Sequence, residues 1–364
     1  MRSLAYARHG TPRGRWVARA LAAAFRSRRS RMDEARVAIV GATGMVGQEM
    51  KRVLEQREFP TAGLTLLASE RSRGRSFDFR GETLPVQVLD ESSFEGVDIA
   101  LFSAGTSISR EFAPIAAGAG AIVIDNSNAF RMDPDVPLVV PEVNASKALE
   151  HKGIIANPNC STIQMVVVLH PLHRRYVIKR VVVTTFQSVS GTGKDAVEEL
   201  KRQVRQVEEG REVTAEVYPH QIAYNCLPHI DVFMENGYCR EETKMLDETR
   251  KIMGVPDLAL TATTVRVPVF VGHGESVNVE FVNPVEPVDA RHLLGGAPGV
   301  EVVDDPARAE YPMAIDCEGK DPSYVGRIRK DFSTANALNM WIVSDNLRKG
   351  AALNAVQIAE LLLT

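Results

Sequence analysis

The chain has 364 residues, of which 45% are hydrophobic and 24% charged, a composition typical of a globular protein with room for two domains. No apolar run approaches the ~20 residues of a membrane-spanning helix, and the four separated cysteines form no C-x-x-C pair, which argues against a disulfide scaffold or a structural zinc site. Residues 1–32 hold nine arginines and no acidic residue, and the net charge of the whole chain is −3. The rest of the chain therefore has 34 basic and 46 acidic residues. This acidic balance disfavours nucleic-acid binding.

Residues 1–33 form a basic leader whose Arg- and Ala-rich composition is shared by organellar transit peptides and by basic amphipathic membrane helices. The alternative is a start codon assigned too far upstream, because Met32 and the two acids after it run directly into the first predicted strand. We expect a disordered tail or a misassigned start. We also expect a cytoplasmic protein without a membrane partner, since dispersed cysteines fit a reducing compartment.

The first predicted strand, residues 36–40, runs into the glycine-rich turn GATGMVG at 41–47, and a helix follows to about Arg57. Such a turn lets the backbone approach a pyrophosphate, which then rests on the helix N-terminus. The spacing G-x-x-G-x-x-G is a variant of the usual fingerprint, so its position between a strand and a helix carries the argument. The alternative is a turn that only packs a helix on a sheet.

A second predicted strand, residues 64–68, ends at Glu70, Arg71 and Ser72. An acid at this place favours the ribose hydroxyls of NAD, whereas a guanidinium with neighbouring hydroxyls suits the 2′-phosphate of NADP. We interpret the segment as favouring NADP. Strands at 98–102 and 121–125, with a helix at 107–119 between them, extend the alternation, which predicts a Rossmann-type, doubly wound α/β domain over residues 34–157.

The segment NPNCST, residues 157–162, places Cys160 at the start of a predicted apolar helix that runs from 161 to 176. Unpaired backbone N–H groups and the helix dipole favour an anion there, so we expect a lowered thiol pKa and a reactive thiolate. The alternative is an inert, buried cysteine. Cys226, Cys239 and Cys317 have no such helix-start context, and we expect them to be packing residues.

Beyond residue 158 the pattern changes to strands at 181–187, 261–270 and 276–281, with a charged helix at 195–209. This indicates a second, α+β domain over residues 158–340. The segment 341–364 predicts an amphipathic helix that packs back on the first domain. The histidines have no spacing typical of a metal site, and we expect no metal.

Five motifs in this order together resemble the bacterial aspartate-semialdehyde dehydrogenases: GATGMVG, NPNCST, Gln187 with Ser190-Gly191, Glu241-x-x-Lys244, and the segment from Arg266 to His273. The resemblance covers residues 35 to 364. It implies NADPH-dependent reductive dephosphorylation of L-4-aspartyl phosphate to L-aspartate 4-semialdehyde, a step towards lysine, threonine, methionine and diaminopimelate. It further implies a homodimer, or a tetramer, built on the second domain.

The resemblance also implies residue roles. Cys160 matches the nucleophile that forms an acyl-thioester, His273 the general acid/base, and Gln187 the residue that orients the acyl group. Among the substrate contacts, Arg266 matches the residue that binds the α-carboxylate and Glu241 the residue that contacts the amino group. Arg131 and Lys244 match the pair that binds phosphate. The implied cofactor contacts are Gly41, Thr43, Gly44, Met45, Val46, Arg71, Ser72, Ser190, Gly191 and Asn346.

The chemistry of the reaction agrees with these residue types. His273 has an ordinary pKa near neutrality, which suits proton transfer, and Arg266 can hold a carboxylate through two hydrogen bonds. An extended segment between them would span roughly 23 Å at ~3.3 Å per residue, so the chain must bend between 268 and 274. The rival N-acetyl-γ-glutamyl-phosphate reductases share the plan but usually read Asn-Pro-Gly-Cys-Tyr. A non-catalytic Rossmann-type paralogue would lack the cysteine.

Overall fold

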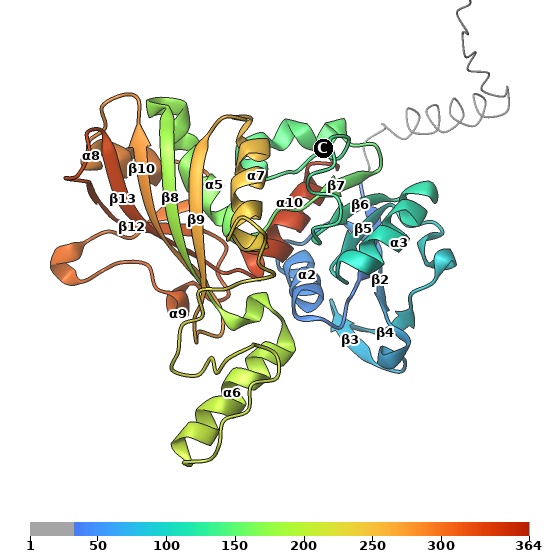
Figure 1. The fold of residues 1–364 in the computed structure, drawn as a ribbon. Helices are drawn as coiled ribbons and strands as arrows, with labels where there is room; N and C mark the ends of the chain where they lie inside the picture. The colour runs from blue at the N-terminus through green and yellow to red at the C-terminus, as the bar shows by residue number, and fades with distance from the viewer. Residues whose placement is uncertain (1–32, 364) are drawn as a thin grey trace, which may run out of the picture.

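The structure is a computed structural model that describes residues 33–363. The predictions for the basic leader therefore lie outside the described residues, except at Asp33. Two sheets, each with its own helices, divide the described residues into two bodies that meet along one side (Figure 1). In the described part of the chain, no helix combines the length and the apolarity needed to cross a membrane.

The first sheet has the strand order β3-β4-β2-β1-β5-β6-β7 and is parallel except for the β3–β4 hairpin. Its strands are β1 Ala35–Val40, β2 Thr61–Ala68, β3 Ser76–Phe79, β4 Glu82–Val88, β5 Ile99–Phe102, β6 Ile122–Asp125 and β7 Ile154–Ala156. The predicted doubly wound α/β sheet is confirmed. The β3–β4 hairpin was not predicted, although the alternation of polar and apolar residues in Ser76–Phe79 is a signal for a half-exposed strand.

Both faces of the first sheet are covered, as a parallel sheet requires. In β1, Val37 and Ile39 pack towards helices α2 (Met45–Gln56) and α10 (Leu353–Glu360). The alternate residues Ala38 and Val40 pack in a separate cluster with helix α3 (Thr106–Gly118). This burial on both sides explains why β1 is a continuous apolar run rather than an alternating one.

The second sheet is mixed, with the order β11-β12-β13-β10-β8-β9. Its strands are β8 Ile178–Gln187, β9 Ala259–Arg266, β10 His273–Phe281, β11 Val300–Val302, β12 Ser323–Lys330 and β13 Ala337–Ser344. Helices α5 (Cys160–Tyr176), α7 (Arg240–Met253) and α8 (Pro287–Gly295) supply the buried partners of one face. The chain turns between β9 and β10, as the distance from Arg266 to His273 predicted.

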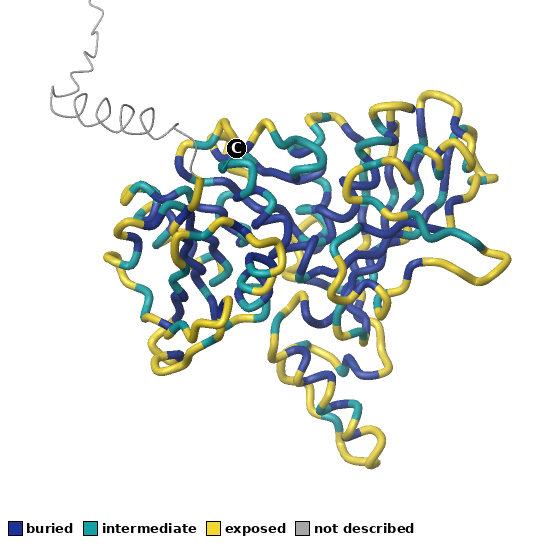
Figure 2. The backbone as a smooth tube through the Cα atoms, turned by 180° about the vertical axis from the view of Figure 1, so that it is seen from behind, coloured by how far each residue is buried: buried dark blue, intermediate teal, exposed yellow. Residues whose placement is uncertain are grey.

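Helix α6 (Lys194–Glu208) projects from the second body, and its tip is among the exposed parts of the backbone (Figures 1 and 2). Two short helices, α4 (Pro141–Asn144) and α9 (Ala314–Cys317), complete the named α-helices of the described residues. The dark core in Figure 2 follows the two sheets and the helices between them.

The prediction for the C-terminal segment is wrong in its first residues. Residues 341–344 belong to β13, and a π-helical turn, Arg348–Ala352, precedes α10. The strand forms because ALNMWIVS is buried between β10 and β12. The segment after Ser344 does return to the first sheet, where Leu353, Val356 and Ile358 join its core. We propose the domain division 34–157 and 158–340 with this returning segment.

Candidate active site

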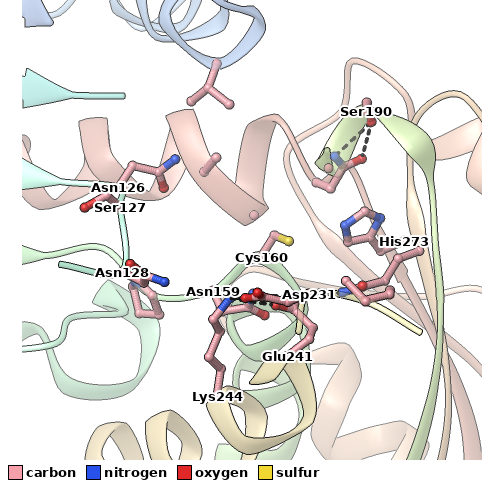
Figure 3. A pocket seen from close by; sticks show the side chains of 18 of the residues that line it. Asn126, Ser127, Asn128, Asn159, Cys160, Ser190, Asp231, Glu241, Lys244 and His273 are labelled. Carbon is pink, nitrogen blue, oxygen red and sulfur yellow. Dashed lines mark hydrogen bonds and ion pairs between the residues drawn. The ribbon is translucent and has the colours of Figure 1, made fainter. Parts of the chain in front are cut away.

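A cleft of about 370 Å³ opens where the ends of β8, β9 and β10 face the first sheet. It is lined by residues from both bodies, and Figure 3 shows their side chains converging around Cys160. Eleven residues that were predicted for the site line this cleft: Val46, Arg131, Cys160, Gln187, Ser190, Gly191, Glu241, Lys244, Arg266, His273 and Asn346.

Cys160 is the first residue of α5, so the helix start predicted from NPNCST is confirmed. Asn159 caps the helix: its side-chain oxygen accepts the N–H groups of Ser161 and Thr162 at 3.0 and 3.2 Å. The Asn159 amide nitrogen donates to Glu241 at 2.7 Å. The cap therefore fixes the start of the helix and ties it to α7. The sulfur of Cys160 is turned towards His273 (Figure 3).

The expected lowering of the thiol pKa is wrong. Burial and, after it, the negative charge of Glu241 raise the pKa of Cys160 to about 12, because Arg266 and Arg131 offset only part of their effect. The N–H groups of Ser161 and Thr162 are bonded to the Asn159 side chain, and the hydrogen bond from the Ser161 N–H to the sulfur lowers the pKa of Cys160 by less than burial raises it. The thiol is therefore protonated at neutral pH and requires a base.

His273 is fully buried at the first position of β10. Burial lowers the pKa of His273 to about 3, and the nearby Arg266 lowers it as well. The neutral ring is therefore the form present at pH 7, not a group that titrates near neutrality as expected. Its Nδ1 lies 3.1 Å from both the backbone N and the hydroxyl of Ser188, and its Nε2 has no partner among residues 33–363.

Gln187 and Arg266 are paired across the parallel strands β8 and β9, which places both at the mouth of the cleft. Arg266 donates through Nη1 to the carbonyl of Ser188 at 2.6 Å, while its buried Nε has no partner within the described residues. Gln187 donates to Glu241 at 3.1 Å and to the hydroxyl of Ser161, and its carbonyl oxygen is likewise without a partner there. Both residues thus retain unused hydrogen-bonding groups.

Glu241 is a buried carboxylate on α7. Burial alone would raise its pKa, but Lys244 and hydrogen bonds from Gln187 and Asn159 outweigh that effect and lower the pKa to about 2. Lys244, one turn further along the helix, donates to Glu241 at 3.1 Å and to Asp231 at 2.8 Å. The negative charge at Glu241 is thus kept at neutral pH, as an anchor for a cation requires.

Arg131 also lines the cleft, and its side chain is almost completely buried. It forms an ion pair with Glu248 at 3.0 Å and donates to the carbonyls of Asn157 and Asn126. The structure therefore brings the expected phosphate pair, Arg131 and Lys244, to one cleft. Each cation already has an acidic partner there.

Asn346 connects the β8–α6 turn to the C-terminal segment. Its side-chain oxygen accepts from Ser188, Ser190 and the backbone N–H of Gly272, and its nitrogen donates to Ser190 at 2.9 Å. Gly191, in the same turn, lies close to two side chains of the site, because a Cβ at this position would be 3.1 Å from both Arg266 and His273. A larger residue at 191 would press on both of these side chains.

The glycine turn after β1 has the close approaches that its sequence predicted. Gly41 has φ +85°, and a Cβ there would lie 2.5 Å from the carbonyl of Ser103. A Cβ on Gly47 would lie 2.3 Å from the carbonyl of Gly41, so the helix start packs directly on the turn. Gly44 is the N-cap of α2, followed by Met45 and Val46 in its first turn.

The end of β2 lies beside this turn, because the hydroxyls of Thr43 and Ser72 are 3.2 Å apart. Glu70, the acid that would favour NAD, is ion-paired with Arg73 at 2.6 Å. Arg71 is exposed next to it and belongs to no ion pair within residues 33–363. The arrangement leaves a cation and hydroxyls for an anionic group, as the NADP interpretation requires.

Some residues of the site were not singled out from the sequence. Ser188 holds the ring of His273, and Glu248 binds Arg131 and the backbone N–H of Asn159. The spacing of Glu241, Lys244 and Glu248 along one helical face is a signal that could have identified Glu248. Asp231, which binds Lys244 from an irregular loop, has no comparable signal.

The other cysteines only partly follow their prediction as packing residues. Cys317 is buried, but Cys226 is exposed. Cys239 is buried at the N-cap of α7, so the statement that it lacks a helix start is wrong. Its sulfur lies 3.1 Å from the hydroxyl of Thr264, away from the residues that line the cleft.

Two family models match the chain over most of its length: the semialdehyde dehydrogenase NAD-binding domain at residues 36–151 and the semialdehyde dehydrogenase dimerisation domain at 169–349. The chain is 58% identical to the aspartate-semialdehyde dehydrogenase of Aquifex aeolicus over 332 residues, which cover 90% of this chain and 98% of that protein.

Solved structures agree with these matches. The crystal structure of aspartate semialdehyde dehydrogenase II complexed with ASA from Vibrio cholerae has a TM-score of 0.89 and 49% identity, covering 91% of this chain and 98% of that chain. The enzyme with NADP from Candida albicans has a TM-score of 0.69 and 25% identity, covering 90% and 98%. The chain belongs to the aspartate-semialdehyde dehydrogenase family.

Proposed function

We propose that Cys160 forms the acyl-thioester through which this chain converts L-4-aspartyl phosphate to L-aspartate 4-semialdehyde. The observation that carries the proposal is the cleft itself, in which a thiol at a helix start faces a neutral imidazole (Figure 3). In the reaction the sulfur attacks the acyl carbon and phosphate leaves, so the thioester keeps the acyl group activated for reduction.

His273 is proposed as the group that moves the proton. Because its Nδ1 lies 3.1 Å from both the N–H and the hydroxyl of Ser188, the neutral ring can carry its proton on either nitrogen. A bare Nδ1 accepts the backbone N–H, and a protonated Nδ1 is accepted by the hydroxyl. Nε2 is thereby able to take the thiol proton in one step and to donate to an oxyanion in another.

The two ends of the amino-acid substrate match the charges that flank the cysteine. Arg266 supplies a guanidinium for the α-carboxylate, and Glu241, whose pKa is about 2, supplies a permanent negative charge for the amino group. Gln187, between them at the end of β8, has an unpaired carbonyl oxygen in the described structure. We assign to it the orientation of the acyl group.

Lys244 and Arg131 are the proposed contacts of the phosphate. Both line the cleft, and each is held by carboxylates, namely Asp231 and Glu241 for Lys244 and Glu248 for Arg131. A phosphate dianion bound there would share these cations with their acidic partners. The two cations stabilise the negative charge of the leaving phosphate as the acyl–oxygen bond breaks.

The cofactor is NADP(H), and its proposed contacts are Gly41, Thr43, Gly44, Met45, Val46, Arg71, Ser72, Ser190, Gly191 and Asn346. The tight turn at Gly41, the N-terminus of α2 and Arg71, which has no ion pair within the described residues, together fit a pyrophosphate and a 2′-phosphate. NADPH, when bound, supplies the hydride that reduces the thioester. Gly191 gives this side of the cleft its width, because it carries no Cβ beside His273.

We further propose a homodimer formed by the second domain, in the cytoplasm. The match of residues 169–349 to a dimerisation-domain model supports the dimer. The cysteines, all of which are free, support a reducing compartment. A tetramer and the exact cellular location stay predictions.

The test follows NADPH formation from NADP, phosphate and L-aspartate 4-semialdehyde, for wild type and for Cys160→Ala. We expect activity in the wild type and a loss of at least about 10³-fold in the variant, since a nucleophile is removed. Cys226→Ser, at an exposed cysteine outside the cleft, is the control and should keep wild-type activity. An inactive wild type or an active Cys160→Ala variant would refute the proposal.

A further inference from the structure

A buried carboxyl group that the reaction does not use lies behind the cleft. Glu275 is in β10, two residues after His273, and its side chain is fully buried. Burial alternates along β10, so Glu275 and His273 share one face of the strand, which packs against α5. Neither oxygen of Glu275 has a hydrogen bond of regular geometry with any residue in 33–363.

No cation compensates Glu275 in the described structure. It takes part in no ion pair among residues 33–363, and its neighbours across the sheet are Thr185 on β8 and Ile342 on β13. Cys160 and His273, at the starts of α5 and β10, are both neutral at pH 7, and the charged groups that act on them are Arg266, Arg131 and Glu241. None of these charged groups shifts the pKa of Glu275. The cations of α5 are confined to its last turn. Burial therefore raises the pKa of Glu275 well above its ordinary value.

The complementary group is Gln164, which is fully buried on α5 one helical turn after Cys160. Its amide nitrogen donates to the backbone carbonyl of His273 at 3.1 Å. Its own carbonyl oxygen has no partner within the described residues. A side-chain hydrogen bond from Gln164 lowers the pKa of Glu275, but burial raises that pKa by more. A neutral carboxyl group carries one O–H donor, which is the donor that the carbonyl oxygen of Gln164 lacks.

We propose that Glu275 is a protonated carboxylic acid whose O–H donates to the side-chain oxygen of Gln164, and that the pair is a positioning device. Through Gln164 it connects the helix that carries Cys160 to the backbone of His273. The proposal rests on the roles proposed above for Cys160 and His273, because their separation matters only if they react together. Glu275 itself is not among the residues that line the cleft.

A purely structural role would be served as well by an apolar residue. Replacing a buried polar pair by apolar groups of similar shape is often neutral for stability, whereas removing one partner leaves the other unsatisfied. Gln164 is instead hydrogen-bonded to the main chain of His273, the proposed acid/base residue. The polar pair can therefore fix the position of His273 relative to the helix that carries Cys160. Small displacements of reacting groups lower catalytic rates steeply.

The protonation state is tested by infrared spectroscopy of the folded enzyme, as the difference between wild type and Glu275→Gln at neutral pH. We expect a carbonyl stretching band of a protonated carboxylic acid that is present in wild type and absent from the variant. A difference spectrum that shows carboxylate bands instead would overturn the proposal.

The positioning role is tested by kinetics of Glu275→Gln and Glu275→Leu. The amide of glutamine keeps an N–H donor for Gln164, so Glu275→Gln should retain kcat within about threefold, whereas Glu275→Leu should lose about 10- to 100-fold in kcat with KM nearly unchanged. Val277→Ala, at the next buried position on the same face, perturbs packing without touching the pair and is the control.

A double variant completes the test. Because the two side chains act as one unit, adding Gln164→Leu to Glu275→Leu should lower kcat by much less than the product of the single effects. If Glu275→Leu loses stability as Val277→Ala does but keeps its kcat, the proposal is wrong. That result is distinct from failure of the proposed function, which would appear as an active Cys160→Ala enzyme.

Discussion

The reactivity of Cys160 depends on residues that are remote from it in the sequence. Its pKa of about 12 is set by burial first and then by Glu241, a residue of another helix. His273, whose pKa burial lowers to about 3, is the neutral base beside it. Both shifts favour the neutral pair of thiol and imidazole over a thiolate and imidazolium pair, so the transfer of the Cys160 proton must accompany the attack of the sulfur on the acyl carbon.

Arg266 offers a residue-scale test of substrate binding. Arg266→Lys keeps the positive charge but loses the planar fork that holds a carboxylate with two hydrogen bonds. We expect KM for L-aspartate 4-semialdehyde to rise about 10- to 100-fold, the range for lost hydrogen bonds to charged groups. Steady-state kinetics measure it, with the exposed Arg180→Lys as control. An unchanged KM would show that Arg266 does not bind the carboxylate.

At the scale of elements, the C-terminal π-helical turn sets the space behind the cysteine. A Cβ on Gly350 would lie 2.8 Å from the Cβ of Cys160, closer than side chains pack. This turn returns from the second sheet to the first, so it fixes the cysteine against both bodies. Such turns are frequent at functional sites.

Gly350→Ala should therefore displace Cys160 and lower kcat about 100-fold, the usual effect of a shift of about 1 Å at a reacting group. Gly118→Ala in α3 is the matched control, because an added Cβ there meets no atom within 4 Å. Kinetics and the thermal midpoint of both variants are measured. Wild-type kcat in a folded Gly350→Ala variant would contradict the described contact.

Local signals predicted the elements well, and long-range contacts explain the errors. The strand–turn–helix at 36–57 and the helix start at Cys160 depend on neighbouring residues, so sequence alone was sufficient. The predicted thiol pKa was wrong because burial outweighs the effect of the helix N–H groups and because Glu241 reaches the site from α7. Residues 341–344 form a strand only because β10 and β12 flank them.

Across the whole molecule, the buried groups of the site make stability dependent on pH. The pKa of His273 is lowered from 6.5 to about 3 in the folded protein. Between these pH values the unfolded chain therefore binds a proton at this residue that the folded protein does not bind. Glu241, also with a lowered pKa, stabilises the fold above its ordinary value of 4.5 and loses this effect as the pH falls towards 2. Both groups therefore favour unfolding in acid.

His273 should lower the free energy of unfolding by about 1.4 kcal/mol for each pH unit below 6.5, because only the unfolded chain takes up its proton. Glu275, whose pKa is raised in the folded protein, has the opposite effect above pH 4.5. Denaturant titrations at several pH values measure the free energy of unfolding. The difference in free energy of unfolding between wild type and His273→Asn isolates the His273 contribution and should change by about 1.4 kcal/mol per pH unit between pH 6.5 and 4.5, where Glu241 does not yet contribute. An identical slope in that variant would exclude His273 as the cause.

The central claim is the acyl-thioester on Cys160, and rapid mixing without phosphate tests it most directly. With NADP and L-aspartate 4-semialdehyde alone, deacylation by phosphate is blocked. We predict a burst of NADPH equal to the concentration of active sites, and mass spectrometry should find the acyl group on the peptide that contains Cys160. The account would be contradicted by an acyl group on another residue, or by steady turnover at the phosphate-saturated rate.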